Sequence, residues 1–125
     1  DTLRSRGLGD VYKRQDKDSF RTILSNLIAN AIKYSPDGST ITLKSSISET
    51  DITLEIADDG YGIEKQNLKR IFDRFYRTDK ARAHTKGTGL GLSLVKQLTN
   101  RLGGNVSVES KINKGSNFFV RLPQK

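Results

Sequence analysis

The sequence contains no cysteine, so neither a disulfide bond nor a thiolate metal site can form. No apolar run approaches the roughly 20 residues that a membrane-spanning helix needs. The basic residues near the N-terminus are not followed by the apolar core of a signal peptide. Hydrophobic residues make up only 34% of the 125 residues, but they cluster in periodic segments. We therefore expect one folded domain with a polar surface rather than a disordered chain.

Lysine and arginine outnumber the acidic residues, which gives the chain a formal net charge of +8. Such a charge is typical of proteins that bind nucleic acid, but a phosphate-bearing small ligand attracts the same side chains. The positive residues are spread along the chain, with one denser stretch from Lys69 to Lys86. No basic patch interleaved with aromatic residues stands out as a surface on which bases could stack. We therefore favour a phosphate-bearing small ligand over nucleic acid.

Residues 1–15 show neither helical nor strand periodicity and contain only four large apolar side chains. We interpret this segment as a leader outside the fold, either non-native or disordered. A poorly patterned edge strand is the alternative. The domain itself is expected to span residues 16–125.

From Asp16 onward, helical and strand patterns follow one another. Three amphipathic helices are predicted: from Asp16 to about Tyr34, around Leu68–Phe75, and from the glycines at 87–91 to Gly103. Alternating apolar residues predict two hairpins, at residues 40–57 and 105–123. Residues 77–88 are polar and basic without periodicity, which predicts a loop. This order favours an α/β sandwich (α+β), with about three helices packed on one face of a mixed, mostly antiparallel sheet.

Three groups of residues could carry chemistry, and the first lies on the first predicted helix. Asn26, Asn30 and Lys33 fall within roughly 60° of one another on a helix, well off-centre from the apolar stripe. Amide oxygens suit a hard cation such as Mg²⁺, and an ammonium group suits phosphate. A solvated helix face is the alternative interpretation of this stripe.

The second group, Asp58 to Ile63, directly follows a hydrophobic strand. Gly60 and Gly62 would let a flat ligand approach the backbone closely. The Asp58 carboxylate can accept a hydrogen bond from the exocyclic amine of adenine, whereas guanine presents a carbonyl there. Such a site would prefer ATP to GTP. An ordinary acidic turn is the alternative.

The third group, Gly87 to Leu92, has glycines at alternate positions running into a helix. Backbone N–H groups at a helix N-terminus are a ready site for an anion. The spacing is not that of a dinucleotide fingerprint, and no strand precedes it. A P-loop is excluded too, because no Gly-Lys-Ser/Thr follows the glycines.

Together, in this order, the three groups and the intervening Phe-Asp-Arg-Phe-Tyr-Arg at 72–77 resemble the N, G1, F and G2 boxes of the histidine-kinase catalytic domain. That domain belongs to the GHKL superfamily, which includes heat-shock 90 chaperones, type II topoisomerases and MutL proteins. The resemblance covers residues 16–123 and implies a Bergerat-type ATP-binding fold. It departs from the family in the last box, where Gly115 survives but an earlier glycine does not. That departure puts a nucleotide contact from Ser116 in doubt.

The resemblance also implies roles for individual residues. Asn30 would coordinate Mg²⁺, Asn26 would lie on the phosphate side, and Lys33 would reach the phosphates and is the one candidate for stabilising the transferred group. Tyr34 would pack beside the nucleotide, Asp58 would take the adenine amine, and Ile63 would line a pocket shaped by Gly60 and Gly62. Residues 77–88 would form a lid with its base anchored to the core by Phe72 and Phe75. The lid cations are Arg77, Lys80 and Arg82, and the phosphates would be wrapped by Gly87, Thr88, Gly89, Leu90, Gly91 and Leu92.

Asn26 separates the branches of the superfamily by chemistry. Members that hydrolyse ATP or phosphorylate serine resemble one another in having a glutamate here as general base, and an amide has no basic pair to offer. The resemblance implies that the chain binds Mg·ATP and supplies the γ-phosphoryl group to a histidine on a separate dimerisation domain. That domain is absent from the sequence, and a response regulator would act downstream. His84, in the predicted loop, is not expected to be the phosphoacceptor.

Two other functions remain open at this point. The chain could be a nucleotide-dependent interaction module that transfers no phosphoryl group, or it could be an ATP hydrolase. Asn26 argues against hydrolysis. The resemblance further implies a cytoplasmic domain of a parent protein anchored in a bacterial membrane.

Overall fold

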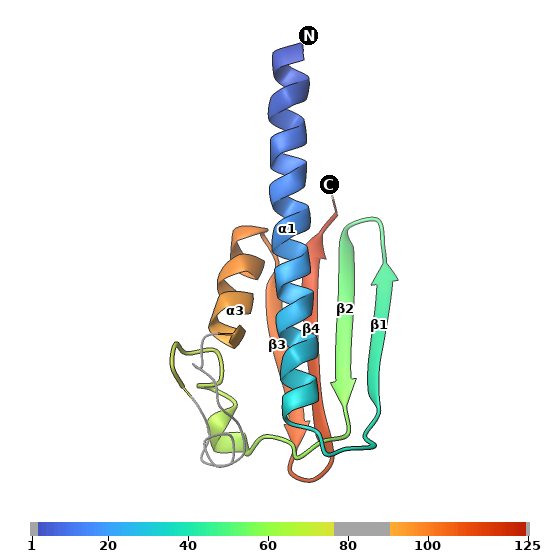
Figure 1. Ribbon diagram of the computed structural model, residues 1–125, viewed down its shortest axis with the longest axis vertical. Helices are drawn as coiled ribbons and strands as arrows, with labels where there is room; N and C mark the ends of the chain where they lie inside the picture. Colours follow the sequence, from blue (N-terminus) through green and yellow to red (C-terminus); the bar gives the residue numbers. More distant parts are fainter. Residues whose placement is uncertain (1–2, 77–90, 125) are drawn as a thin grey trace.

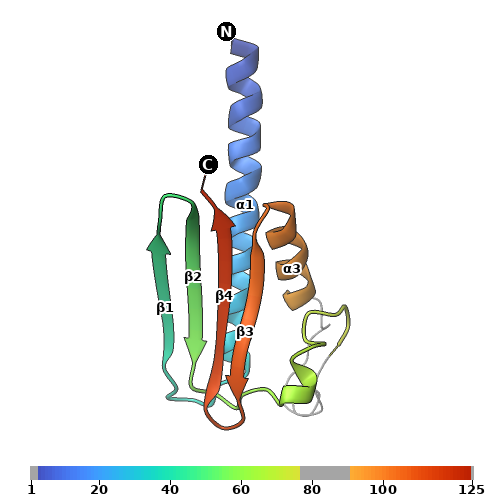
Figure 2. The ribbon, with the colours of Figure 1, turned by 180° about the vertical axis from the view of Figure 1, so that it is seen from behind.

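The computed structural model describes residues 3–76 and 91–124, with side chains from residue 16 onward (Figure 1). Four strands form one antiparallel sheet in the order β1-β2-β4-β3. The strands are β1 (Ile41–Ile47), β2 (Asp51–Asp58), β3 (Asn105–Lys111) and β4 (Gly115–Pro123). Two helices, α1 (Leu3–Lys33) and α3 (Gly91–Arg101), cover one face, and Figure 2 shows the other face bare of helices. The predicted α+β sandwich is confirmed, with two described helices and with every strand pair antiparallel.

Helix α1 packs against the sheet through one stripe. Ile23, Leu27 and Ala31 recur every four residues on this stripe and are buried. The helix ends at Lys33, as predicted from Pro36, and the Tyr34 N–H donates to the Asn30 carbonyl at 3.2 Å. Its start differs from the prediction, because α1 begins at Leu3 rather than near Asp16. The first half of α1 projects beyond the end of the sheet (Figure 1), which explains why its sequence has no apolar periodicity.

The core lies between the helices and the middle of the sheet. Ile56, Phe118 and Val120 of β2 and β4 are buried against Ile23 and Val95 of the helices. The register pairs Ile56 with Phe118 and Phe118 with Val108, so the apolar residues of neighbouring strands share this face as predicted. On the edge strand β1, in contrast, Leu43 is 50% exposed and Ile47 is 71% exposed. Figure 1 shows no helix over β1, so its apolar alternation predicts the strand but not its burial.

Helix α3 confirms the prediction of a helix that ends at two glycines. Gly103 has a positive φ of 84°, and its N–H donates to the Asn100 carbonyl at 3.0 Å. The Gly104 N–H donates to the Thr99 carbonyl, also at 3.0 Å. This pair of bonds is a Schellman motif, which glycine favours because of the left-handed backbone conformation.

The amphipathic helix predicted around Leu68–Phe75 is wrong. The structure has one 3-10 turn, η1 (Lys65–Asn67), followed by turns up to residue 75. Five N–H groups in this segment donate to carbonyls three residues back, the first from Asn67 to Glu64 and the last from Tyr76 to Asp73. Phe75 has a φ of 65°, which no right-handed helix contains. Ile71 is nevertheless buried and Phe72 packs against the core, so the apolar spacing marks real contacts in a different backbone.

None of the described helices combines the length and apolar character needed to cross a membrane.

Candidate functional site

The predicted polar stripe of α1 lies beside the N-terminus of α3. Asn26 and Asn30 are half-buried, whereas Lys33 is exposed. The Asn26 Nδ2 donates to the Thr22 carbonyl at 2.8 Å, which fixes the side chain. A Cβ at Gly91 would lie 3.1 Å from the Asn26 Oδ1, so the first residue of α3 approaches the stripe closely because it is glycine. The structure therefore brings together Asn26 and Gly91, which are 65 residues apart in the sequence.

Asp58 is the last residue of β2 and is only 9% exposed. Its Oδ1 accepts a hydrogen bond from the Gly60 N–H at 3.0 Å. Burial raises the pKa of the Asp58 carboxyl, and repulsion from Asp59 adds to this, while hydrogen bonds from the backbone of Gly60 and Ser116 lower it. A buried carboxylate with backbone donors is held in one orientation and remains able to accept further hydrogen bonds.

Gly60 and Gly62 allow close approaches that no other residue could make. A Cβ at Gly60 would lie 2.4 Å from the Tyr34 carbonyl oxygen. Gly62 has a φ of 75°, and its Cβ would lie 2.0 Å from the Lys111 carbonyl oxygen. The turn after β2 therefore packs directly on the end of α1 and on the β3–β4 hairpin. These glycines position the turn by backbone contact.

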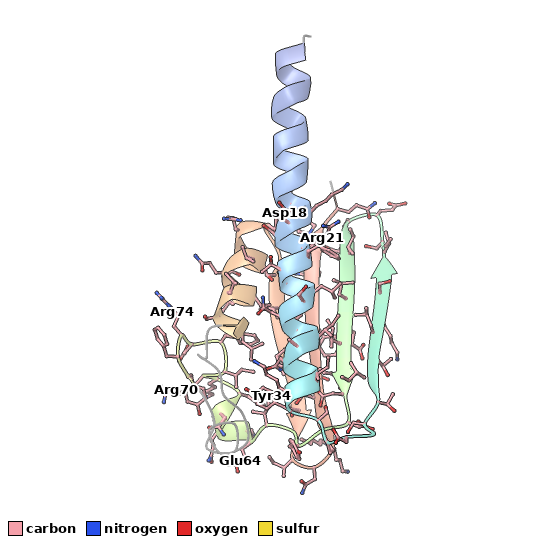
Figure 3. All side chains as sticks on the ribbon, viewed as in Figure 1. Asp18, Arg21, Tyr34, Glu64, Arg70 and Arg74 are labelled. Carbon is pink, nitrogen blue, oxygen red and sulfur yellow. The ribbon has the colours of Figure 1, made fainter. Side chains whose placement is uncertain are left out.

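The end of α1 and the turn after β2 are joined by a backbone hydrogen bond, because the Tyr61 N–H donates to the Tyr34 carbonyl at 3.2 Å. Tyr34 is half-buried and lies at the end of the packed part of α1, as Figure 3 shows. We refer to Tyr34, Ser35, Asp58 and Gly60 as the α1–β2 corner. At this corner the second predicted group meets the end of α1, the helix that carries the first group.

The sequence does not predict the two linked hydroxyl groups on the β3–β4 hairpin. The Ile63 N–H donates to the Ser110 Oγ at 2.7 Å, and the Ser110 Oγ lies 2.8 Å from the Ser116 Oγ. Ile63 is half-buried and packs against the core. Gly115 has a φ of 97°, and a Cβ there would lie 1.9 Å from the Asp58 carbonyl oxygen. Gly115, the glycine that the last box retains, was a sequence signal for its close contact with Asp58. Nothing in the sequence, however, places Ser110 opposite Ile63.

Phe72 and Phe75 were both expected to anchor the base of a lid to the core, and only Phe72 does so. Its ring contacts Phe118 edge to face, with centroids 6.2 Å apart and an interplanar angle of 88°. Phe75 is 62% exposed, so its expected anchoring to the core is wrong. Its left-handed backbone conformation turns the side chain away from the core, and the Arg74 guanidinium lies 5.5 Å from its ring centroid.

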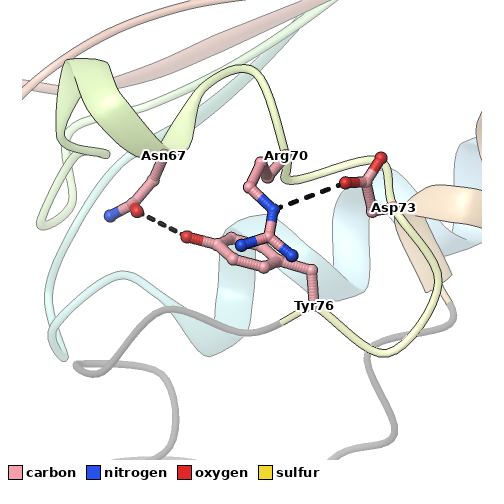
Figure 4. A network of polar contacts seen from close by, with 4 residues as sticks. All are labelled: Asn67, Arg70, Asp73 and Tyr76. Atoms are coloured by element: carbon pink, nitrogen blue, oxygen red, sulfur yellow. Dashed lines mark hydrogen bonds and ion pairs between the residues drawn. The ribbon is translucent and has the colours of Figure 1, made fainter.

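A polar network holds the turns that precede Phe75 (Figure 4). The Tyr76 hydroxyl donates to the Asn67 Oδ1, and the Arg70 guanidinium lies 4.5 Å from the centre of the Tyr76 ring. Arg70 also pairs with Asp73, with an Nε–Oδ2 distance of 3.6 Å. Because the ion pair is exposed, the ring contact and the hydroxyl bond contribute more to holding these turns.

Several predicted site residues fall outside the described residues: Arg77, Lys80, Arg82, Gly87, Thr88, Gly89 and Leu90, together with His84. Of the third group, Gly91 begins α3, and Leu92 is half-buried and packs against the core.

A cleft between α1 and α3 contains none of the predicted site residues. It is lined by Asp18, Ser19, Thr22, Leu94, Leu98 and Arg101. Arg101 donates from its guanidinium to the Ser19 Oγ at 3.1 Å. In Figure 3 the labelled Asp18 lies far along α1 from Tyr34, so this cleft is separate from the α1–β2 corner.

Two known sensor proteins are similar to this chain in sequence. The chain is 39% identical over 119 residues to the sensor histidine kinase WalK of Bacillus subtilis, covering 93% of this chain and 20% of WalK. It is 40% identical over 110 residues to the sensor protein SrrB of Staphylococcus aureus, covering 87% of this chain and 19% of SrrB. The chain thus spans about a fifth of the length of these relatives.

Solved structures show the same fold. The mycobacterial sensor histidine kinase MprB has a TM-score of 0.77 and 32% identity, over 85% of this chain and 72% of that structure. A structure of full-length ShkA in complex with AMPPNP gives a TM-score of 0.73 at 32% identity, over 84% of this chain and 21% of that one. The nucleotide-free catalytic domain of the histidine kinase ThkA gives 0.73 at 28% identity, over 85% and 67% of the two chains.

Residues 15–125 match the family described as histidine kinase-, DNA gyrase B- and HSP90-like ATPases. The chain belongs to that family, and its likeness to WalK, SrrB and MprB makes it the ATP-binding catalytic domain of a two-component sensor histidine kinase.

Proposed function

We propose that this domain binds Mg·ATP at the α1–β2 corner and presents the γ-phosphoryl group to a histidine on another domain of the parent kinase. The observation that supports this most strongly is that three elements carrying the predicted groups pack together along α1, with α3 beginning further back on α1 than the end of β2 (Figure 1). The end of α1 carries Asn30 and Lys33, the end of β2 carries the buried Asp58, and α3 begins beside Asn26.

Asp58 would recognise the base. Its carboxylate is held by the Gly60 N–H and can accept a further bond from the exocyclic amine of adenine. Guanine presents an acceptor at that position, so two acceptors would face each other. The preference for ATP over GTP would arise from that repulsion.

Asn30 is the residue that we propose as the magnesium ligand. It is half-buried, and its side chain makes no hydrogen bond to another described residue, which suits an amide oxygen reserved for a cation. One protein ligand is enough for Mg²⁺, which keeps several waters and binds phosphate oxygens. When bound, the ion would neutralise charge on the phosphates. Lys33 is exposed three residues further along α1, within reach of the same phosphates.

In the proposed transfer, an imidazole nitrogen of the partner domain attacks the γ-phosphorus and the bond to the bridging oxygen breaks, leaving ADP. This domain would contribute positioning and charge neutralisation. Asn26 cannot act as a base, and its amide is already bonded to the Thr22 carbonyl. The phosphoryl group would then pass to a response regulator. The family resemblance further leads us to propose that the parent kinase is anchored in a membrane with this domain on the cytoplasmic side.

Calorimetric titration with ADP and ATP, with and without Mg²⁺, tests the binding. We expect both nucleotides to bind, ATP more tightly with Mg²⁺, and GTP to bind more weakly than ATP. Asn30→Ala should remove the magnesium dependence. An unchanged dependence in that variant would exclude Asn30 as the ligand.

Transfer is tested by mixing the chain with the histidine-bearing helices of a related kinase and labelled ATP. Label should appear on the helices and not on this chain. Stable label on this chain alone would contradict the division of labour, and tight ATP binding without any transfer would favour a nucleotide-dependent interaction module.

A further inference from the structure

The hydroxyl oxygen of Ser35, just after α1, is buried without a partner. Its Oγ is shielded from solvent and makes no hydrogen bond to any described residue, and among these residues only the Thr99 Oγ1 is in the same situation. A buried hydroxyl without a partner loses its bonds to water and gains none in return. Folding alone therefore does not explain a serine at this position.

The Ser35 hydroxyl lies next to the carboxylate that would bind the base. The Ser35 Oγ and the Asp58 Oδ1 are 2.8 and 2.9 Å from the point where a Cβ of residue 60 would lie. Both oxygens therefore occupy the space that Gly60 leaves open. Thr99, in contrast, is a buried residue of α3 and is not among the atoms nearest the Cβ position of residue 60.

The backbone on both sides of this space is fixed. The Tyr34 carbonyl accepts from the Tyr61 N–H, and the Asp58 Oδ1 accepts from the Gly60 N–H. A change in the Ser35 side-chain rotamer or a shift of the chain after α1 would bring the hydroxyl to the carboxylate. A hydroxyl donor to a charged acceptor makes a strong hydrogen bond.

We propose that Ser35 is a positioning residue for Asp58, whose hydroxyl donates to the carboxylate when nucleotide is bound; the inference rests on the function proposed above. Ser35 follows Asn30 and Lys33 by five and two residues. Phosphate and metal contacts on α1 would therefore move the same short segment that carries the hydroxyl. In this arrangement, Ser35 links the phosphate end of the site to the residue that holds the base.

The test compares three variants of the chain by calorimetry with ADP. Ser35→Ala removes the hydroxyl beside Asp58, and Thr99→Val removes the other unpartnered hydroxyl while keeping its shape. We expect Ser35→Ala to weaken ADP binding about tenfold, the effect of one hydrogen bond to a charged group. Thr99→Val should stay within about twofold of the wild type, and Ser35→Thr should restore affinity because it restores a hydroxyl.

Titration with a second nucleotide distinguishes a loss of Asp58 positioning from a general loosening of the structure in Ser35→Ala. Purine riboside diphosphate lacks the amine from which Asp58 would accept a hydrogen bond. Ser35→Ala should therefore leave the affinity of the chain for this nucleotide unchanged. Equal losses for both nucleotides, or no loss of ADP affinity, would overturn the inference. If the wild-type chain bound no ADP, both the proposed function and this inference would fail. The wild-type titration shows that outcome directly.

Discussion

At the scale of single residues, Asp58 shows how stability and binding make opposite demands. Burial raises the pKa of its carboxyl, so the folded chain holds this proton more tightly than the unfolded chain does. Over the pH range between the ordinary and the raised pKa, the free energy of unfolding therefore falls as the pH rises. At neutral pH the ionised carboxylate costs stability, while the contact that we propose with the adenine amine would require it as an acceptor.

The first prediction follows from the same shift. ADP affinity should fall on acidification as Asp58 gains a proton, at a pH above that expected for an ordinary aspartate. Asp58→Asn should weaken ADP binding about tenfold or more and abolish this pH step. Calorimetry with ADP over a pH series measures both effects.

Asp59 offers the matched control for this series. Its charge adds to the rise in the pKa of Asp58, so Asp59→Asn should move the step to lower pH without removing it. A step that survives in Asp58→Asn would assign the titration to another group.

The second prediction concerns Gly60. In Gly60→Ala the new Cβ would collide with the Tyr34 carbonyl oxygen, which is backbone and cannot rotate away. We expect the free energy of unfolding to fall by ~1–3 kcal/mol, as for other overpacked sites, and ADP binding to weaken because α1 is displaced from Asp58. Gly38→Ala is the control, since φ there is +84° but nothing lies within 4 Å. It should cost ~1–2 kcal/mol through backbone strain alone and leave ADP affinity unchanged.

At the scale of elements, the turns between η1 and Phe75 supply the third prediction. Phe72→Ala should lower the free energy of unfolding by roughly 2 kcal/mol, less than the ~3–5 kcal/mol of a fully buried phenylalanine. Phe75→Ala removes an exposed ring and keeps the left-handed backbone, so it should change stability by less than about 0.5 kcal/mol. Urea unfolding of both variants provides the comparison, and equal losses would contradict the different roles of the two rings.

The same segment shows what the sequence could not predict. The strands and α3 follow from local signals, such as alternating Ile, Leu and Val, and Gly103-Gly104 after the last helical turn. The spacing of Leu68, Ile71 and Phe72 fits a helix, but successive turns with bonds three residues back also place such residues on one side. Periodicity alone does not distinguish the two backbones.

The site was predictable to the extent that its residues carry chemistry in short motifs. Asn30 and Asp58 could be named as candidates from these motifs. The family resemblance also implies that α1 and β2, the elements that carry them, meet. The Ser35 and Ser110 hydroxyls could not be found this way, because their importance depends on neighbours 25 and 47 residues away, at Gly60 and Ile63. Long-range contacts of small polar residues leave no periodic trace in a sequence.

At the scale of the whole molecule, the two halves of α1 differ in whether they lie over the sheet. From Ser19 to Ala31 every fourth residue of the helix is buried, and Arg101 of α3 bonds to Ser19. Before Asp16 the helix extends past the end of the sheet (Figure 1). The match to the family begins at residue 15, close to this division. Stability and binding should therefore depend on the part of α1 that follows it.

The last prediction tests this division by truncation. A chain that begins at Asp16 should keep the free energy of unfolding within about 0.5 kcal/mol and keep its ADP affinity, because the helix before Asp16 extends past the end of the sheet (Figure 1). A chain that begins at Thr22 loses Ser19 and Phe20, which contact Arg101 and the core, and should be clearly less stable. Urea unfolding and calorimetry measure both chains. A large loss from the shorter truncation would mean that residues 1–15 belong to the folded domain, and the boundary at residue 16 would have to be abandoned.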